Sequence, residues 1–288
     1  MTASRWGCVV LTMGRRPHGL ADALGSLLRQ RGVELDVVVV GNGWAPEGLP
    51  PGVRGLALPE NVGIPAGRNA GVDAVTGDLM LFLDDDAALR DDDTLARLAD
   101  GFAAEPGLGL VQPRVLDPDG LPAPRRWVPR LVVGDPAHSS DVTAVWEGAV
   151  AVRRSAFEAA GRWPAEFWYA HEGIDLAWGV WDAGGTVRYR ADVVALHEAN
   201  DPGRQPELHR LAGRNRVWLA RRRLPQPLAV VYPLVWLALT LGRSRDLGAV
   251  WRTLLGYAQG LAHPPELRRP MSWRTVWRMT RTGRPPVI

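Results

Sequence analysis

Three consecutive aspartates, Asp84, Asp85 and Asp86, stand directly after the apolar run of residues 79–83. Carboxylate oxygens are the ligands that Mg²⁺ and Mn²⁺ prefer, and such an ion can neutralise the charge of a diphosphate. Carboxylates two residues apart at a strand end can share this work, because one can reach a ribose while the other holds the ion. Plain acidic turns have the same composition, and we expect the nearby run 91–93 to be only a solvated helix cap. Support for a metal site must therefore come from the surrounding residues.

A glycine-rich segment, residues 61–71 (NVGIPAGRNAG), precedes this strand. Glycines allow the backbone to approach a ligand closely. Arg68, near the expected start of a helix, has the charge and the donor geometry to meet a phosphate or a base. An ordinary loop that leads into a helix would have a similar composition, so the segment gains weight only together with its neighbours.

The elements that would position these residues alternate along the chain, because short apolar runs predict strands and apolar residues at helical spacing predict helices. The predicted strands are residues 7–13, 35–40, 56–58, 79–83, 108–112, 142–152 and 187–196, and the predicted helices are residues 20–30, one ending near 75, 94–104, 155–160 and 172–183. This alternation predicts the α/β class with a parallel sheet. Ligands in such sheets bind beyond the carboxyl ends of the strands, so Met13, Asn42 and Asp84 should converge on one crevice.

The motifs, taken in order, resemble glycosyltransferase family 2. In that family a first strand ends in a short loop, a second ends in an Asp-Asn-Gly-Ser-like turn, and an Asn-x-Gly-x-x-x-x-Arg-Asn-x-Gly loop precedes a strand with Leu-Asp-x-Asp. The matching segments here are Thr12-Met13-Gly14, Gly41-Asn42-Gly43, residues 61–71, Leu83-Asp84-Asp85-Asp86, Trp146-Glu147-Gly148-Ala149, Val152-Arg153-Arg154 and residues 167–176. The resemblance covers about residues 7–200. It implies a GT-A fold (a Rossmann-like α/β fold) and inverting transfer of a sugar from a nucleotide-diphosphate sugar to an acceptor hydroxyl.

The resemblance also implies roles for the matched residues. The metal, Mg²⁺ or Mn²⁺, would be held by Asp84, Asp86 and His197, which ends the last predicted strand. The nucleotide-sugar donor would be bound by Thr12, Gly14, Asn42, Asn61, Gly63, Arg68, Asp84 and Asp85. His197 also has a purely structural interpretation, because a lone histidine often serves packing.

Two glycines depart from the family pattern. Gly41 stands where the family usually has an acid, which leaves Asn42 as the group that can hydrogen-bond a base edge. Gly173 stands where the family often has its catalytic base, and glycine cannot accept a proton. Glu172 is therefore the expected base, with Asp175 as the fallback, because the acceptor hydroxyl must lose its proton as it attacks. The alternative for both acids is stabilisation of a helix N-terminus.

The C-terminal part of the chain differs in charge and composition. From residue 201 onward there are 16 arginines and 4 acids, whereas residues 1–200 hold 18 arginines and 27 acids. The apolar run 228–241 is shorter than the ~20 residues that a bilayer span needs. Tryptophans interleaved with arginines, from Trp218 to Trp277, favour an element at a membrane surface. A helix pair that merely covers the domain fits the length equally well.

We divide the chain into a nucleotide-sugar-binding half (1–112), an acceptor-binding half of the same GT-A domain (113–200) and a C-terminal helical, basic region (201–288). In the last region, Arg214-Asn215-Arg216 either contacts phosphate or faces solvent. We expect a cytoplasmic protein without a signal peptide, either free or peripheral at the inner face of the cell membrane. Its acceptor would be a glycan or a lipid-linked acceptor such as a polyprenyl-linked glycan. We expect no nucleic-acid partner, and Cys8 is interpreted as a buried core residue.

Two other functions remain open at the level of sequence. A sugar nucleotidyltransferase has a similar α/β core and acidic metal site, with a glycine-rich loop that carries Arg and Lys after the first strand. Gly14-Arg15-Arg16-Pro17 imitates that loop only weakly, because the chain contains no lysine. The other alternative is a non-catalytic protein that binds nucleotide sugars, and Gly41 and Gly173 keep it open.

Overall fold

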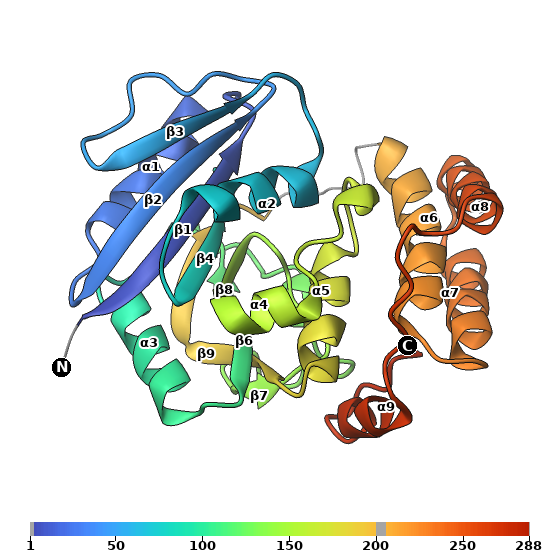
Figure 1. Cartoon of the computed structure of the whole chain (residues 1–288). Helices are drawn as coiled ribbons and strands as arrows, with labels where there is room; N and C mark the ends of the chain where they lie inside the picture. The colour runs from blue at the N-terminus through green and yellow to red at the C-terminus, as the bar shows by residue number, and fades with distance from the viewer. Residues whose placement is uncertain (1–2, 200–205, 288) are drawn as a thin grey trace.

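The computed structural model describes residues 3–199 and 206–287 and is built around one sheet (Figure 1). The strand order is β3-β2-β1-β4-β8-β6-β9-β5, with the short β7 paired to β9. The first four strands run parallel and are β1 (Ser4–Thr12), β2 (Val33–Asn42), β3 (Val53–Leu58) and β4 (Leu79–Asp84). Their carboxyl ends therefore lie at one edge of the sheet, as the sequence predicted for Met13, Asn42 and Asp84.

The residues of β1 alternate between two hydrophobic cores, because successive side chains of a strand point to opposite faces. Val9 lies in one core, whereas Cys8 and Val10 lie in the other. Burial on both faces explains why these strands appear in the sequence as continuous apolar runs. Cys8 is fully buried, which confirms its interpretation as a core residue. The helices that cover the two faces are α1 (Pro17–Leu28), α2 (Ile64–Ala74) and α3 (Thr94–Ala104).

The second half of the sheet is mixed, which corrects the expected parallel sheet. Its strands are β5 (Ala87–Leu89), β6 (Leu108–Leu116), β7 (Ser140–Asp141), β8 (Ala149–Arg153) and β9 (Thr186–His197). β8 is antiparallel to both β4 and β6, and β5 and β7 are antiparallel to β9. A run of apolar residues does not encode the direction in which its strand will pair. β6 runs through residue 112, so the two expected halves share one sheet.

The strand expected at residues 142–152 is confined to its C-terminal part, β8. From residue 142 to the start of β8 the backbone makes isolated hydrogen bonds and no continuous strand. The N–H of Trp146 donates to the side chain of Gln112, and the N–H of Val142 donates to the carbonyl of Val187. Two helices follow β8, α4 (Arg154–Ala160) and α5 (Glu172–Asp182). Two short 3₁₀ turns lie at Arg125–Trp127 and Ala165–Phe167.

The C-terminal region is helical, as expected, and comprises α6 (Pro206–Arg223), α7 (Leu228–Arg243), α8 (Leu247–Ala262) and α9 (Trp273–Thr280). Figure 1 shows α6, α7 and α8 grouped beside the α/β body. α6 and α8 approach closely because their glycines leave room for the backbone of the other helix. A Cβ at Gly256 would lie 2.0 Å from the carbonyl oxygen of Arg210, and one at Gly213 would lie 2.5 Å from that of Thr253. No helix within the described ranges is both long enough and apolar enough to cross a bilayer. The expected boundary at residues 200 and 201 lies outside the described residues.

Candidate active site

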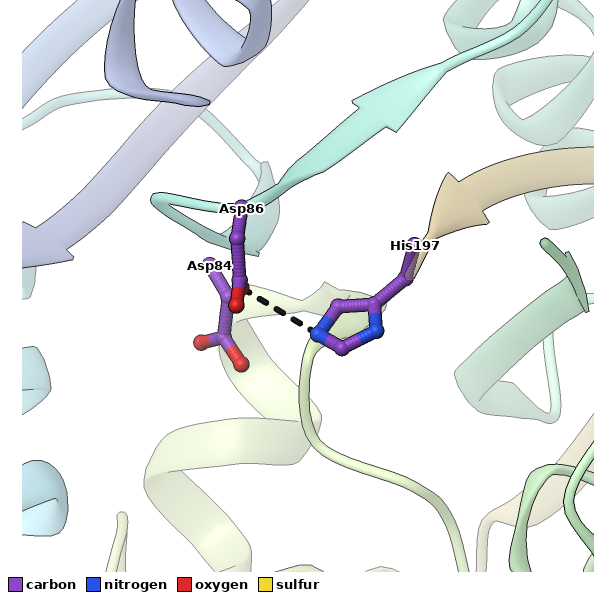
Figure 2. Close-up of side chains that lie close together, drawn as sticks. All are labelled: Asp84, Asp86 and His197. Carbon is purple, nitrogen blue, oxygen red and sulfur yellow. Dashed lines mark ion pairs between the residues drawn. The ribbon is translucent and has the colours of Figure 1, made fainter. Parts of the chain in front are cut away.

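The ends of β4 and β9 bring two aspartates and a histidine together (Figure 2). Asp84 is the last residue of β4, and the pairing of Ala87 with His197 places Asp86 beside the imidazole. The Nε2 atom of His197 lies 3.2 Å from Oδ1 of Asp86. One ligand atom from each of the three residues lies within 4.8 Å of the others. Two carboxylates and an imidazole suit a divalent cation such as Mn²⁺, so this donor set fits the expected metal.

The ring of His197 is fixed in the orientation that a metal ligand needs. Its Nδ1 lies 2.6 Å from the carbonyl oxygen of Glu198, which can only accept, so Nδ1 carries the proton of the neutral ring. Trp127 and Trp146 pack edge-on against the imidazole, with ring centroids 5.7 and 4.9 Å away. Nε2 therefore faces Asp86, where it can donate to the carboxylate when protonated and bind a metal when neutral. Trp127 belongs to the proline-rich stretch between β6 and β7, which therefore packs at the site.

Electrostatic interactions couple the charges of this cluster. Burial opposes protonation of His197, but the hydrogen bond to Asp86 and the charges of Asp86 and Asp84 raise the pKa of the imidazole. Burial likewise acts against ionisation of Asp86, yet His197 and Arg16 lower the pKa of this carboxyl below its usual range. Asp86 is therefore ionised at neutral pH, and the cluster has the negative charge that attracts a cation.

Asp85 contacts the end of β1. Thr12 Oγ1 donates to Asp85 Oδ2 at 2.5 Å, and the N–H of Gly14 donates to Thr12 Oγ1 at 3.0 Å. Burial raises the pKa of Asp85 against the opposing hydrogen bond from Thr12, and the charges of Asp86 and Asp84 add to the rise. Arg16 pairs with Asp86 and lies 3.7 Å from Asp85. The structure thus brings three of the expected donor-binding residues together and adds Arg16, whose role the sequence did not indicate.

The side chain of Asn42 shapes the loop at residues 61–63. Its Nδ2 donates to Asn61 Oδ1 at 2.9 Å and to the carbonyl of Gly63 at 3.2 Å. Its Oδ1 accepts from the N–H of Val62 at 2.8 Å, and the residue is 4% exposed. Asn42 thus makes three hydrogen bonds within the protein, and its expected contact with a base edge stays a prediction. Asn42 therefore positions Asn61 and Gly63, two of the other expected donor-binding residues.

The turn after β2 requires glycine at position 41. A Cβ there would lie 1.9 Å from the carbonyl oxygen of Trp44, so an acid does not fit without a shift of the turn. The indole of Trp44 covers Gly14, where a Cβ would lie 2.5 Å from the ring. Trp44 is half-buried and lies where the ends of β1 and β2 meet, and sequence reasoning did not single it out.

Arg68 is buried and holds Asp84. Its Nη2 donates to Asp84 Oδ1 at 2.6 Å and to the carbonyl of Glu147 at 3.1 Å, and its guanidinium lies 5.1 Å from the ring centroid of Trp163. Arg68 is only 2% exposed. Its Nη1 finds no hydrogen-bond partner among the described residues, so one buried donor is left for a ligand or a water.

Glu172, the expected base, opens α5 and is only 2% exposed. Burial and the charge of Glu147 raise its pKa to about 8. Its Oε2 finds no hydrogen-bond partner within the described part of the chain. Burial also raises the pKa of Glu147, against the opposing effects of the Gly173 N–H and the charge of Arg68. Glu147 and Glu172 thus form an interacting pair of carboxyl groups, of which the sequence analysis singled out only Glu172.

Asp175, the fallback base, has a structural role instead. It is fully buried, and its two carboxylate oxygens accept from Arg223 at 2.9 and 2.7 Å. Arg222 Nε lies 3.1 Å from the same carboxylate. A fully buried carboxylate that is enclosed by two arginines has no open face for a substrate hydroxyl. Asp175 therefore joins α5 to α6, which corrects its expected role.

Asn215 and Arg214 face the α/β body, so neither expected alternative, phosphate contact or solvent, describes them. Asn215 is fully buried, and its Nδ2 lies 2.9, 2.7 and 2.8 Å from the carbonyl oxygens of Phe167, Tyr169 and Ala170. Arg214 Nη2 donates to the carbonyl of Phe167 at 2.8 Å. Arg216, the third residue of that run, packs over the indole of Trp236.

The loop that Asn215 contacts has an unusual backbone. Trp168, Ala170 and His171 have φ angles of 65°, 72° and 70°, the left-handed region that favours glycine. Each such residue costs of order 1–3 kcal/mol and persists only where its surroundings enforce it. The carbonyl of Trp168 also accepts from the N–H of Ile64 at 2.8 Å. The loop thus connects the glycine-rich segment to the start of α5, where Glu172 lies.

Structural comparison identifies the fold as that of the GT-A glycosyltransferases. GalNAc-T7 with UDP, GalNAc and Mn²⁺ has a TM-score of 0.66 at 13% identity, over 99% of this chain and 59% of that one. The mannosyltransferase PcManGT from Pyrobaculum calidifontis has a TM-score of 0.57 at 18% identity, over 98% and 85%. S. aureus TarS residues 1–349 have a TM-score of 0.60 at 16% identity, over 85% and 74%. At these identities the likeness establishes the fold alone.

Residues 8–160 match the sequence profile of Glycosyl transferase family 2. This is more than half of the chain, which therefore belongs to glycosyltransferase family 2, and the resemblance read from the motifs is confirmed. The pre-mycofactocin glycosyltransferase of Mycobacterium tuberculosis is 28% identical over 248 residues, which cover 78% of this chain and 48% of that protein. The chain thus spans about half the length of the curated relatives it matches. Asp84 and Asp86 lie within the matched range, whereas Glu172 and His197 lie beyond it.

Proposed function

We propose that this chain transfers a sugar from a nucleotide-diphosphate sugar to an acceptor hydroxyl, with inversion at the anomeric carbon. The observation that carries this proposal is the convergence of Asp84, Asp86 and His197 at the carboxyl edge of the sheet, next to the contact of Thr12 with Asp85. The class of donor is supported by the structural relatives, since PcManGT binds GDP-Man with Mn²⁺ and TarS binds UDP-GlcNAc.

The residues at this edge of the sheet would have different roles in metal and donor binding. Asp84, Asp86 and His197 would hold a divalent cation, Mg²⁺ or Mn²⁺, which would neutralise the charge of the departing diphosphate. Arg68 fixes Asp84 through the bond of 2.6 Å, so this ligand is oriented before the donor binds. Asp85, whose Oδ2 accepts from Thr12, would present Oδ1 to the ribose. The backbone of Gly14 and of the loop around Asn61 and Gly63 would surround the donor.

We also propose that the acceptor is presented at the inner face of a membrane, as a glycan or lipid-linked acceptor. The exposed tryptophans of α8 and α9, Trp251, Trp273 and Trp277, support this, because indole rings favour the membrane–water interface. α7 has two different faces. Tyr232 packs against Trp178 of the body, whereas Val230 and Leu234 are exposed. The region is strongly basic, which suits anionic lipid headgroups.

The direct test is a panel of UDP- and GDP-sugars, each measured with and without Mn²⁺. We expect one donor class to raise the melting temperature only when Mn²⁺ is present, because binding to the folded state stabilises it. The same donor should then release its nucleoside diphosphate slowly in water. If none of the donors does either, the proposal is wrong. Release of pyrophosphate from a nucleoside triphosphate and a sugar 1-phosphate would instead identify a nucleotidyltransferase.

A further inference from the structure

The carboxylate of Glu147 occupies the space that a side chain at position 173 would fill. The N–H of Gly173 donates to Glu147 Oε1 at 2.8 Å. A Cβ built on Gly173 would lie 2.5 Å from that same oxygen and 2.6 Å from the carbonyl oxygen of Val145. Position 173 is therefore glycine because Glu147 and the backbone before it pack against the first turn of α5. The carboxylate that the family often has at position 173 of α5 is absent here, and the carboxylate of Glu147, from the segment before β8, lies in its place.

Glu147 also lies next to the metal-binding end of β4. β4 and β8 pair antiparallel with Leu83 opposite Ala149, and the N–H of Asp84 donates to the carbonyl of Gly148 at 2.8 Å. Gly148 is thus the neighbour of Asp84 on β8's side, and Glu147 is the residue just before Gly148 in the chain. Arg68 bridges the two, because Nη2 bonds both to the Asp84 carboxylate and to the Glu147 carbonyl. The backbone of Glu147 thus lies beside Asp84, and the charges of Arg68 and Asp84 act on its carboxyl group.

Of the two interacting carboxyl groups, Glu147 belongs to the less buried residue. Glu147 is partly exposed, whereas Glu172 is sealed at 2% exposure and its Oε2 lacks a hydrogen-bond partner among the described residues. A buried carboxyl without partners is stable when it retains its proton, since an isolated buried charge is costly. The raised pKa of Glu172, about 8, agrees with this assignment.

We propose that Glu147 is the catalytic base and that Glu172 is a neutral positioning residue beside it. This inference rests on the proposed function and reassigns the proton acceptor within it. The acceptor oxygen forms its bond to the anomeric carbon while the bond from that carbon to the diphosphate oxygen breaks. The electron pair of the broken bond leaves with the diphosphate, and the proton of the acceptor hydroxyl moves to Glu147. Gly173 holds Oε1, which leaves Oε2 to meet that hydroxyl.

The test uses Glu147→Gln and compares two nucleophiles, water and azide, with the nucleotide sugar that the wild-type protein hydrolyses. Glutamine keeps an oxygen for the N–H of Gly173 but cannot take a proton. Metal-dependent hydrolysis should therefore fall by ~10²–10⁴-fold, the usual contribution of a general base. Azide carries no proton, so formation of the glycosyl azide should stay within about tenfold of the wild-type rate, because the step no longer needs a base. A merely structural role would depress both reactions alike.

Two variants complete the comparison. Glu172→Gln mimics a protonated carboxyl, so we expect its hydrolysis to fall far less than that of Glu147→Gln. Glu34→Gln removes an exposed carboxylate at the amino end of β2 and should behave as wild type. Stabilisation by Mn²⁺ with the nucleoside diphosphate verifies that each variant is folded and binds.

Each remaining outcome has one meaning. Near-wild-type hydrolysis by Glu147→Gln, or loss of hydrolysis and azide reaction together, overturns the assignment of Glu147. A large, azide-rescued loss in Glu172→Gln with little change in Glu147→Gln would return the base to Glu172. In all three cases the wild-type protein is still active, so the proposed function survives. Absence of metal-dependent turnover in the wild type with every nucleotide sugar would instead overturn the proposed function itself.

Discussion

Asp175 and Arg223 meet through two hydrogen bonds, of 2.9 and 2.7 Å, at a place where both side chains are buried. They come from α5 and α6, so this ion pair joins the α/β body to the first C-terminal helix. Removal of one partner from a buried pair leaves an uncompensated charge, which costs more than the pair contributes when intact.

We therefore expect Asp175→Ala to lower the free energy of unfolding by ~3–5 kcal/mol, because Arg222 and Arg223 lose their common partner. Chemical denaturation measures this change. The matched control is Glu158→Ala in α4, which breaks the exposed pair with Arg162 and should cost less than ~1 kcal/mol. Equal small effects in the two variants would contradict a structural role for Asp175.

Asp86→Asn should abolish the Mn²⁺-dependent rise in melting temperature that a nucleotide sugar produces. The variant removes the charge of one proposed metal ligand and leaves a side chain of the same size, so packing around His197 changes little. We expect donor turnover to fall by at least ~100-fold, because the charge of the leaving group is no longer neutralised. Asp93→Asn, which neutralises an exposed aspartate just before α3, is the control and should match the wild type.

The pH dependence of metal binding should follow His197. Its pKa is raised in the folded protein by Asp86 and Asp84 despite burial, so the proton competes with the metal up to a higher pH than in an ordinary histidine. Mn²⁺ affinity, measured by calorimetry between about pH 6 and pH 8, should increase as pH rises through this pKa.

Without metal, the sign of the pH effect on stability is opposite. The protonated imidazole stabilises the cluster below the pKa of an unfolded histidine, and this contribution is lost as pH rises through the higher folded pKa. Chemical denaturation in the presence of a chelator should therefore give a decline with pH that is absent in His197→Gln. An identical pH profile in the variant would show that His197 does not titrate against Asp86.

Replacement of Trp251, Trp273 and Trp277 by serine should weaken binding to vesicles made of equal parts phosphatidylglycerol and phosphatidylcholine. Wild-type binding should also weaken as salt is added, because the basic region is attracted to the anionic lipid. Leu121→Ser with Val132→Ser removes exposed apolar side chains from the α/β body and is the matched control. Absence of wild-type binding in a vesicle flotation assay would exclude the proposed membrane surface.

The sequence predicted the order of the elements and the acidic end of β4 because both are local. An apolar run followed by Asp84, Asp85 and Asp86 needs no knowledge of distant residues. His197 could be named because it ends another predicted strand. The antiparallel placement of β8 could not be predicted, since the direction of pairing depends on the path of the chain and not on the composition of the strand.

Glu147 escaped the sequence analysis for a physical reason. The carboxylate of Glu147 packs against a helix that begins 25 residues later in the chain. No residue spacing within a single helix or strand therefore points to this contact. In the sequence, Gly173 showed only that the usual acid is missing at this position. The structure shows that the absence of a side chain there makes room for Glu147. Gly41 is similar, because the carbonyl of Trp44 fills the volume of the acid usual in the family. Arg214 and Asn215 were polar residues on an expected basic helix, and only tertiary packing turned them inward.

Asn215 links the C-terminal region to the loop that leads into α5. Its amide lies within 2.9 Å of three carbonyl oxygens of the loop that precedes Glu172, and that loop contains three non-glycine residues with left-handed backbone. A graft that moved only the α/β body to another protein would carry Asp84 and Asp86 but leave this loop without its support. The conformation of this loop therefore depends on α6 as well as on the α/β body.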